Sequence, residues 1–321
     1  MMGVDALSLA ANVGLLAFLA LSAYVLLIGG EISFGQQAFF GLGAYGAGLV
    51  TVLGGAPLWA ALLVAVFIGA LTGGALGALT LRLRGLYFSM STLAAAEATR
   101  VALQWLSWRQ GVPSDGPQGS PPEMAGPDGA AGFGGIRYIF EHGIDPARYV
   151  SLVWCLLLAL VAGLWLLERS RAGLALRVAG HDPALAESMG IDVRRAKLGA
   201  AMLAGAIAAL GGALYAHYNT YIESRNFDVM LGIHGVSYAL IGGLGTPLGP
   251  LLGVTLDIVL LEATRAFQGY RMAVFGGLVA VLLIVRPRGL LDEILVRRLA
   301  RWRPRLPRRR RVRSLTSEEL P

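Results

Sequence analysis

Polar side chains that could do chemistry stand close together in residues 30–45, a glycine-rich stretch of an otherwise apolar sequence. They are one carboxylate, one hydroxyl and two carboxamides, at Glu31, Ser33, Gln36 and Gln37. At membrane depth such groups are costly unless they face a cavity or a partner, and a broken helix is tolerated where it borders an enclosed or watery space. The stretch therefore has two interpretations: a passage lined by these side chains, or a short interfacial loop in which Glu31 meets water.

A second polar cluster follows in residues 85–94, where hydroxyl side chains occur among apolar ones at Tyr87, Ser89, Ser91 and Thr92. Glu97 and Arg100 come after it, and their i,i+3 spacing places them on neighbouring positions of one helix face. We expect these two residues to form a neutralised structural pair rather than a contact to a substrate.

Residues typical of enzymes and metal sites do not occur at the spacing that their chemistry requires. The only lysine, Lys197, follows no glycine-rich phosphate-binding loop, so the chain is not expected to bind and hydrolyse ATP. The histidines lack zinc-ligand spacing: His142, His181, His217 and His234. Ser237 lies three residues after the last of them, but no Gly-x-Ser-x-Gly elbow supports an intramembrane protease. We therefore predict a chain that is not an enzyme and binds no metal or cofactor of its own.

Composition predicts the elements that would position these residues. The 321 residues have a mass of 33.8 kDa and a mean hydropathy of +0.63; 55% are apolar, 44 are glycine and only 15% are charged. Soluble domains carry about 25% charged residues, so this chain lacks the polar surface that water requires. These values indicate a polytopic α-helical membrane protein. They exclude a disordered chain, and the single cysteine, Cys155, excludes a disulfide scaffold.

Apolar stretches that are long enough, or nearly long enough, to cross a bilayer recur along the chain: 6–28, 34–53, 58–81, 86–106, 149–167, 198–218, 232–244, 248–266 and 272–285. Either of the first two could be re-entrant, and the seventh is short for a full span. The predicted fold is an all-α, polytopic transmembrane helical bundle with about eight spans and room for broken or re-entrant segments. Residues 1–290 would form the transmembrane domain, and residues 291–321 a basic cytoplasmic tail.

Basic residues orient the predicted bundle. The last 36 residues hold twelve arginines against four acids. By the positive-inside rule, the basic segments 82–84, 168–197 and 286–313 should be cytoplasmic, and segments 108–148 and 219–231 should be outside. The N-terminus is then outside if both early stretches cross. Contact of the tail with anionic lipid is favoured over binding of nucleic acid, because the tail follows a series of hydrophobic spans.

The basic loop before the sixth apolar stretch predicts two short helices. Residues 171–179 have an amphipathic pattern that ends at Gly180. Asp182 can cap a second helix that begins at Pro183 and ends at Gly190. Such a compact pair of helices could dock into a groove on another protein, or it could lie on the membrane surface.

Glycines repeat every four residues at Gly69, Gly73 and Gly77, and again from Gly245 to Gly253. Small residues at this spacing let helix backbones approach closely in lipid. We favour tight static packing of these faces over a moving or subunit-contacting role.

Several of these stretches, in order along the chain, resemble one family: the M-type membrane-spanning subunits of ABC importers for branched-chain amino acids. The resemblance extends over about residues 25–290. The matching segments are 32–36, 39–45, 85–88, 92–94, 173–177, 189–193, 211–216, 242–246 and 249–250, together with Lys197. One segment alone is weak, whereas five in order are quite specific to the family. Urea importers share much of the pattern.

The resemblance implies a complex in the inner membrane. It would contain two different permease subunits, two cytoplasmic ATPases that use ATP, and an external or periplasmic solute-binding protein. The loop 170–193 would dock on an ATPase, and we expect this coupling contact to use Arg177, Asp182, Pro183, Glu187 and Gly190. The path near residues 33–37 and 87–92 would switch sides by alternating access.

The predicted function is therefore that of a membrane-spanning permease subunit of an ATP-driven importer for leucine, isoleucine or valine. One alternative is an importer subunit for urea, an amide or another amino acid. Alternatives from other classes are an intramembrane enzyme, which the absent catalytic spacing disfavours, and a structural scaffold, which polar groups at membrane depth disfavour. In such importers the solute is selected chiefly by the solute-binding protein.

Overall fold

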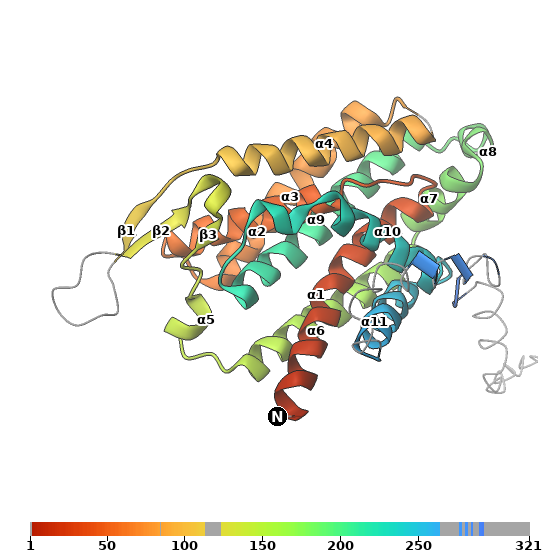
Figure 1. Cartoon of the computed structure of the whole chain (residues 1–321). Helices are drawn as coiled ribbons and strands as arrows, with labels where there is room; N and C mark the ends of the chain where they lie inside the picture. The colour runs from red at the N-terminus through yellow and green to blue at the C-terminus, as the bar shows by residue number, and fades with distance from the viewer. Residues whose placement is uncertain are drawn as a thin grey trace, which may run out of the picture.

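The computed structural model describes residues 2–83, 85–112, 123–263, 276–277, 280–281, 284 and 289–291, and it is mostly helical (Figure 1). The first helices are α1 (Met2–Ile28), α2 (Gln36–Val52), α3 (Leu58–Thr80) and α4 (Leu86–Trp105). Then come β1 (Gln110–Val112), β2 (Glu123–Pro127), η1 (Gly129–Ala131), β3 (Phe133–Gly134) and α5 (Tyr138–Glu141). The remaining elements are α6 (Pro146–Arg169), α7 (Arg171–His181), α8 (Pro183–Ser188), α9 (Val193–Asn219), η2 (Ser224–Phe227), α10 (Val229–Gly242) and α11 (Leu248–Ala263).

The predicted apolar stretches up to residue 263 coincide with helices, which confirms the helical bundle. In the described part of the chain, four helices are long and apolar enough to cross a membrane, namely α1, α3, α6 and α9. The apolar helices α10 and α11 are shorter. The total of about eight spans therefore stays a prediction. Of the ninth stretch, 272–285, the structure describes only residues 276–277, 280–281 and 284, and of the basic tail, 291–321, only residue 291.

Helix α9 packs against α1, α2 and α3 (Figure 1), and its approach to α3 depends on glycine. A Cβ atom on Gly205 of α9 would lie 2.1 Å from the carbonyl oxygen of Gly69, and one on Gly73 would lie 2.4 Å from that of Ala201. The two backbones are thus in direct contact, as small residues permit in lipid. The expected tight packing is confirmed, because the face with Gly69, Gly73 and Gly77 contacts α9 of the same chain.

The second glycine repeat packs α10 against α11. A Cβ atom on Gly249 would lie 2.1 Å from the Gly243 carbonyl oxygen, and one on Gly253 would lie 2.0 Å from that of Tyr238. Backbone hydrogen bonds then join the described segment 289–291 to the end of α10. The residues that precede the basic tail therefore lie beside the end of α10.

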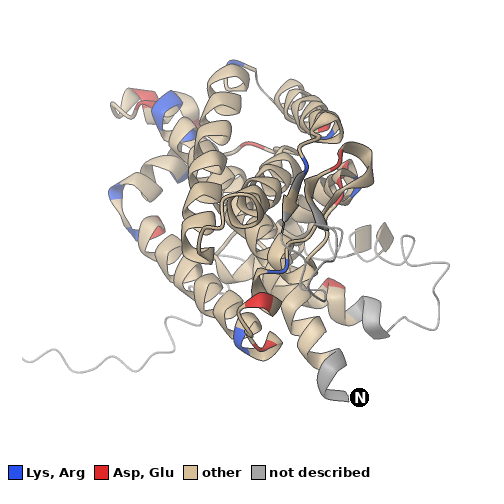
Figure 2. Ribbon diagram, turned by 90° about the vertical axis from the view of Figure 1, so that its left-hand side faces the viewer, with Lys and Arg blue, Asp and Glu red and all other residues tan. Residues whose placement is uncertain are grey.

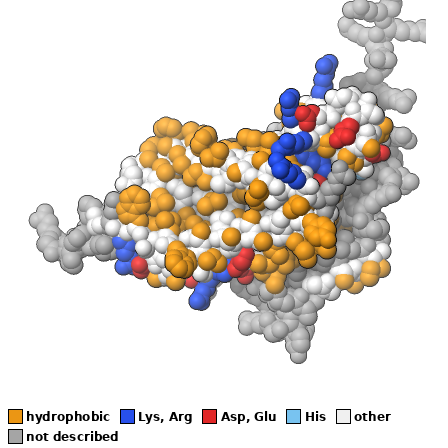
Figure 3. Space-filling model, turned by 90° about the horizontal axis from the view of Figure 1, so that it is seen from above, with side chains coloured by type: hydrophobic (Ala, Val, Ile, Leu, Met, Phe, Trp, Pro, Cys, Tyr) orange, Lys and Arg blue, Asp and Glu red, His pale blue; other side chains and the backbone are white. Residues whose placement is uncertain are grey.

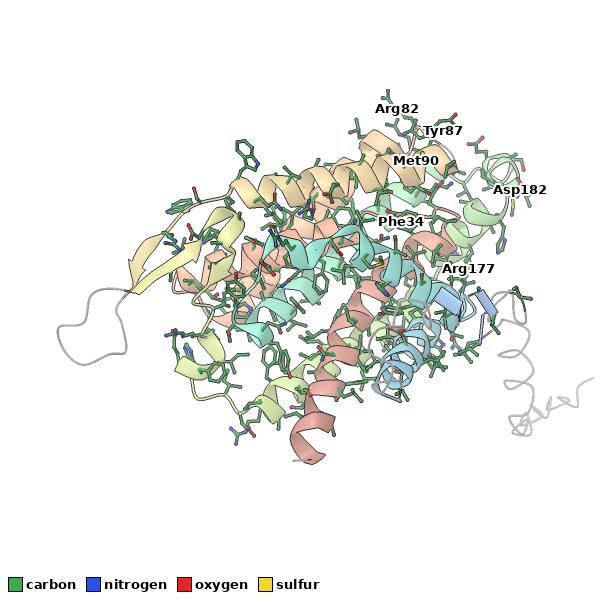
Figure 4. All side chains as sticks on the ribbon, viewed as in Figure 1. Phe34, Arg82, Tyr87, Met90, Arg177 and Asp182 are labelled. Atoms are coloured by element: carbon green, nitrogen blue, oxygen red, sulfur yellow. The ribbon has the colours of Figure 1, made fainter. Side chains whose placement is uncertain are left out.

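The two ends of the bundle carry different segments. Arg82 and Asp182 lie at one end, where α3 ends and where α7 and α8 connect α6 to α9 (Figure 4). The opposite end carries the segment that follows α4 and the link after α9, which a β-bridge between Phe133 and Ile222 joins. Most of the helical ribbon between the ends has no Lys, Arg, Asp or Glu (Figure 2). The described parts of the segments expected on the cytoplasmic side, 82–84 and 168–197, thus lie at one end of the bundle. The described parts of the segments expected outside, 108–148 and 219–231, lie at the other.

The outward faces of α3 and α4 are largely apolar, as Figure 3 shows from above. Trp59 and Phe67 on α3 are 66% and 69% exposed, and Trp105 on α4 is 82% exposed. Soluble monomers rarely expose contiguous apolar patches of large area. Contact with lipid hydrocarbon or with another apolar protein surface would account for these exposed faces.

Residues 108–148, expected as a polar loop, contain a small antiparallel sheet in the order β1-β2-β3. The sequence did not predict this sheet. Its described strands have only two to five residues, which is too short to show the alternation of apolar and polar residues that marks a strand. Phe133 and Ile136 are fully buried and attach this segment to the bundle. A Cβ atom on Gly48 of α2 would lie 2.6 Å from the Phe133 ring, so the segment packs directly on the last turns of α2.

The contact between α3 and α9 yields a stability prediction. We expect Gly205→Ala to lower the apparent melting temperature of the detergent-purified protein, because overpacking costs about 1–3 kcal/mol. Gly199→Ala on the same helix is the matched control, since its Cβ would meet nothing within 4 Å. Thermal unfolding followed by size-exclusion chromatography measures both. Equal melting temperatures for the two variants would contradict the close approach.

Candidate functional site

The connection from α1 to α2 is a break in the helical path rather than a tight turn. Helix α1 ends at Ile28, and Gly30 has a φ of +78°, a conformation that glycine adopts without strain. A Cβ atom on Gly30 would lie 2.5 Å from the Gly180 carbonyl oxygen, so α1 ends directly against α7. Residues 31–35 then form neither helix nor strand before α2 begins at Gln36.

Helix α2 begins well inside the bundle. It runs alongside the second half of α9: a Cβ atom on Gly43 would lie 2.1 Å from the Ala209 carbonyl oxygen, and His217 Nε2 lies 3.2 Å from Thr51 Oγ1. Gln36 lies seven residues before Gly43, so α2 starts near the middle of the 27-residue helix α9. This geometry fits the broken-helix interpretation better than a short interfacial loop.

An ion pair stands at the first residue of the break. Lys197 Nζ of α9 lies 2.5 Å from Glu31 Oε1, and their side chains are only 15% and 10% exposed. The Glu31 carboxylate is therefore neutralised by a residue in the second turn of α9, rather than solvated by bulk water. Removing one member of such a pair leaves a buried charge uncompensated.

Two hydroxyl residues of α4 hold the extended stretch in place. Ser89 Oγ donates to the Ile32 carbonyl oxygen at 2.6 Å, and the Phe34 backbone N–H donates to Thr92 Oγ1 at 3.2 Å. Ser33 Oγ accepts a hydrogen bond from the backbone N–H of Gly35 at 3.1 Å. These side chains supply the partners that a regular helix would otherwise provide.

The other two predicted residues of α4 do not reach the break. Ser91 Oγ donates within its own helix to the Phe88 carbonyl oxygen at 2.9 Å. The Tyr87 side chain is 75% exposed on the apolar outer face. Glu97 and Arg100 form the expected structural pair, with Arg100 Nη2 2.5 Å from Glu97 Oε1.

Gln36 and Gln37 are the most unusual groups of the site. Both are buried, at 0% and 1% exposure, and none of their four side-chain polar atoms has a hydrogen-bond partner among the described residues. The Gln37 carboxamide lies against the bare backbone of Gly232 in α10, where a Cβ atom would lie 2.1 Å from its Oε1. An unsatisfied buried polar group costs about 1–3 kcal/mol, and more than about 90% of such groups have partners in folded proteins. A polar solute or water would supply the hydrogen bonds that these atoms lack.

The predicted coupling loop forms the two expected helices, α7 and α8. Asp182 caps α8, since its Oδ1 accepts a hydrogen bond from the Leu185 N–H at 3.0 Å, and Gly190 follows with a φ of +79°. The expected end of the first helix at Gly180 was wrong, because α7 continues to His181. Gly180 instead permits the close contact with the end of α1.

The predicted coupling residues point in two directions. Asp182, Pro183, Glu187 and Gly190 are exposed at the end of the bundle. Arg177 points into the bundle (Figure 4), with Nη2 3.2 Å from Glu168 Oε1, 3.3 Å from the Tyr24 hydroxyl and 3.4 Å from the Leu244 carbonyl oxygen. It therefore joins α7 to α1, to α6 and to the end of α10.

Sequence reasoning missed two exposed apolar residues beside the predicted coupling residues. Leu185 and Met189, on and just after α8, are 52% and 66% exposed. The sequence did contain a signal for them, because residues at i and i+4 of a capped helix lie on the same face. Together with Glu187 they form what we term the α8 knob.

The family match extends over almost all of the described bundle. A family model described as the permease component of the branched-chain amino acid transport system matches residues 6–286. The chain belongs to this family. The resemblance found in the sequence is therefore confirmed.

Curated relatives of this chain are similar over different lengths. The high-affinity branched-chain amino acid transport system permease protein LivM of Escherichia coli is 29% identical over 82% of this chain and 64% of its own length. The probable branched-chain amino acid transport permease protein LivH of Methanocaldococcus jannaschii is 28% identical over 39% of this chain and 41% of its own. The nucleoside ABC transporter permease protein NupB of Lactococcus lactis is 30% identical over 32% of this chain and 29% of its own. No solved structure shows a significant match.

The ion pair at the break of this permease chain yields a second prediction. We expect Lys197→Met to lower the apparent melting temperature, because leaving the Glu31 carboxylate buried and unpaired costs about 3–5 kcal/mol. Adding Glu31→Gln to that variant should recover part of the loss, since it removes the unpaired charge. A thermal-stability double-mutant cycle measures the coupling. Strictly additive effects of the two changes would show that the pair does not form.

Proposed function

We propose that this chain is the membrane-spanning permease subunit of an ATP-driven importer for branched-chain amino acids. The observation that carries the proposal is the break between α1 and α2. It places the unpartnered carboxamides of Gln36 and Gln37 inside an apolar helical bundle of a permease family. Polar groups and discontinuous helices at membrane depth are typical of transport pathways.

The translocation path would pass the break. On one side of Gln36 lie the Glu31–Lys197 ion pair and the end that carries α7 and α8. On the other side, α2 continues toward the sheet β1-β2-β3. A solute that passes would exchange hydrogen bonds with the carboxamides, and alternating access would open them first to one end and then to the other. Ser33, Ser89 and Thr92 would keep the extended stretch in position.

Coupling to ATP would run through α7 and α8. The α8 knob is the exposed part of this segment, and it fits a partner that presents an apolar groove with a basic group for Glu187. Arg177 would transmit a movement of α7 to α1 and to the end of α10, because its guanidinium contacts Tyr24 of α1 and Leu244, two residues after α10. The ATPases would be separate subunits in the cytoplasm.

The remaining partners and the location follow from the same proposal. A second permease subunit would complete the path, and a solute-binding protein would deliver the amino acid at the end that carries the sheet. The chain would lie in the inner membrane with α7 and α8 on the cytoplasmic side. The exposed apolar faces of α3 and α4 would contact lipid or the second permease subunit.

One specific observation supports a second substrate class. The nucleoside permease relative shows that similarity to this chain is not confined to proteins named for amino acids. A nucleoside, urea or amide importer subunit is therefore the alternative.

Reconstituted transport tests the proposal. The chain, its second permease subunit, the ATPases and the solute-binding protein would be assembled in liposomes, and uptake of radiolabelled leucine would be measured against a nucleoside and urea. We expect uptake of leucine that requires ATP and the binding protein. Uptake of only the nucleoside or urea would replace the proposed solute. Leucine uptake without ATP would refute the coupled importer.

The α8 knob yields a further prediction. We expect the double change Leu185→Asp and Met189→Asp to abolish ATP-driven uptake while leaving the chain in the membrane, because it places charge in an apolar contact. Phe140→Asp is the control for co-purification of the ATPases, since Phe140 is 68% exposed on α5 at the opposite end, away from the proposed ATPase contact. Uptake and co-purification of the ATPases would be measured for both. Undiminished uptake by the double variant would eliminate α8 as the coupling contact.

A further inference from the structure

The N-terminus of α2 has no side-chain cap, as is also the case for α3, α4, α5 and α6. The starts of α7, α8, α9 and α10 are each capped by a side-chain oxygen, from Ser170, Asp182, Asp192 and Asp228. The N-cap of α2 is Gly35, which has no side chain. Its own N–H donates to Ser33 Oγ, and the Ala38 N–H donates to the Gly35 carbonyl oxygen at 3.1 Å. No described hydrogen bond uses the backbone N–H of Gln36 or Gln37.

Two buried carboxamides stand at this same point. Side chains on a helix tilt toward its N-terminus, so the side chains of the first two residues of α2 lie near its uncapped end. Neither carboxamide has a hydrogen-bond partner among the described residues, and both side chains are at most 1% exposed. The start of α2 therefore combines two free backbone donors, two free NH₂ groups and the positive end of a helix dipole.

The charges near this point are already compensated. Glu31, which begins the extended stretch, is paired with Lys197 of α9. Glu97 of the adjacent helix α4 is paired with Arg100. An anion at the start of α2 would thus meet free donors and a positive dipole without an unpaired carboxylate to repel it.

We propose that the first turn of α2, with the side chains of Gln36 and Gln37, binds the carboxylate group of the transported amino acid. The inference rests on the proposed function, because it takes the break as part of the translocation path. The carboxylate oxygens accept hydrogen bonds from the Gln36 and Gln37 backbone N–H groups and from their carboxamide NH₂ groups. Uncapped helix starts bind anions in this way, including the half-helices of transporters.

The ligand chemistry that follows is specific. A carboxylate satisfies donors, whereas a cation would be repelled by the dipole and would leave the NH₂ groups unsatisfied. Urea and nucleosides carry no carboxylate, so their neutral carbonyl oxygens would gain less from the dipole than an anion. Both glutamines are enclosed here, and Gln37 rests on Gly232. The subsite therefore opens to the solute in another state of the transport cycle.

Charge-selective labelling of a cysteine tests the subsite without depending on uptake. In the complete reconstituted importer carrying Cys155→Ser, Gln36→Cys would be treated with anionic and cationic methanethiosulfonates of similar size. Each rate, followed by mass spectrometry during ATP turnover, is divided by the rate with a free thiol in solution. We expect the normalised anionic rate to exceed the cationic rate about tenfold, equivalent to about 1.4 kcal/mol. Leucine supplied with the binding protein should slow the reaction.

Tyr45→Cys is the matched control, and Gln37→Cys is the second test position. The Tyr45 hydroxyl is also buried on α2 and has no hydrogen-bond partner in the described part of the chain, but Tyr45 lies nine residues after Gln36. Its normalised rate ratio should be near one. Equal or cation-favouring rates at both glutamine positions would overturn the carboxylate subsite and leave the path intact. If neither reagent reaches either position in any nucleotide state, the path at the break is refuted as well.

Discussion

Backbone N–H and C=O groups inside a bilayer must find partners within the protein, and the extended stretch between α1 and α2 is where this chain meets that demand with side chains. Ser89 and Thr92 of α4 bond the backbone of Ile32 and Phe34, and Ser33 bonds that of Gly35. Helix α4 is therefore the structural partner of the break. Because these hydroxyls are used by the backbone, the carboxamides of Gln36 and Gln37 remain as the free polar groups of the site.

Two contacts join the residues before the break to α7: a backbone contact between glycines and the hydrogen bonds of Arg177. Gly30 and Gly180 bring the end of α1 and the end of α7 into backbone contact. Arg177, one turn earlier on α7, contacts both Tyr24 and Leu244. A rigid shift of α7 would therefore move the residues directly before the break. Helix α9 begins just after α8 and carries Lys197, so the Glu31 ion pair would respond to the same shift.

Much of the fold could be predicted from the sequence, because apolar runs and caps are local signals. The helices α1 to α4, α6 and α9 follow the apolar stretches, and the cap at Asp182 was read from residue order alone. The short sheet and the inward direction of Arg177 were not predictable, since both depend on partners distant in sequence. Both Ser89 and Tyr87 carry a hydroxyl group, so the residue types did not show that Ser89 bonds the backbone of the break whereas Tyr87 faces outward. Only the packing of α4 against residues 31–35 distinguishes them.

An aromatic cluster closes the other side of the break. Phe40 lies four residues and Tyr45 nine residues beyond Gln36 on α2. The rings of both pack within about 6 Å, centroid to centroid, of Phe227 in η2, and Tyr45 also packs on Phe133 of β3. A solute arriving from the end that carries the sheet would have to displace these rings before it reached the carboxamides. Phe133 and Phe227 lie in segments that connect the long helices. Such connecting segments move more readily than packed helices. On the proposed path, opening this side would break these aromatic contacts, whereas opening the other side would separate the Glu31–Lys197 pair. The two sides of the break are thus closed by different kinds of interaction, and a change that weakens one need not weaken the other.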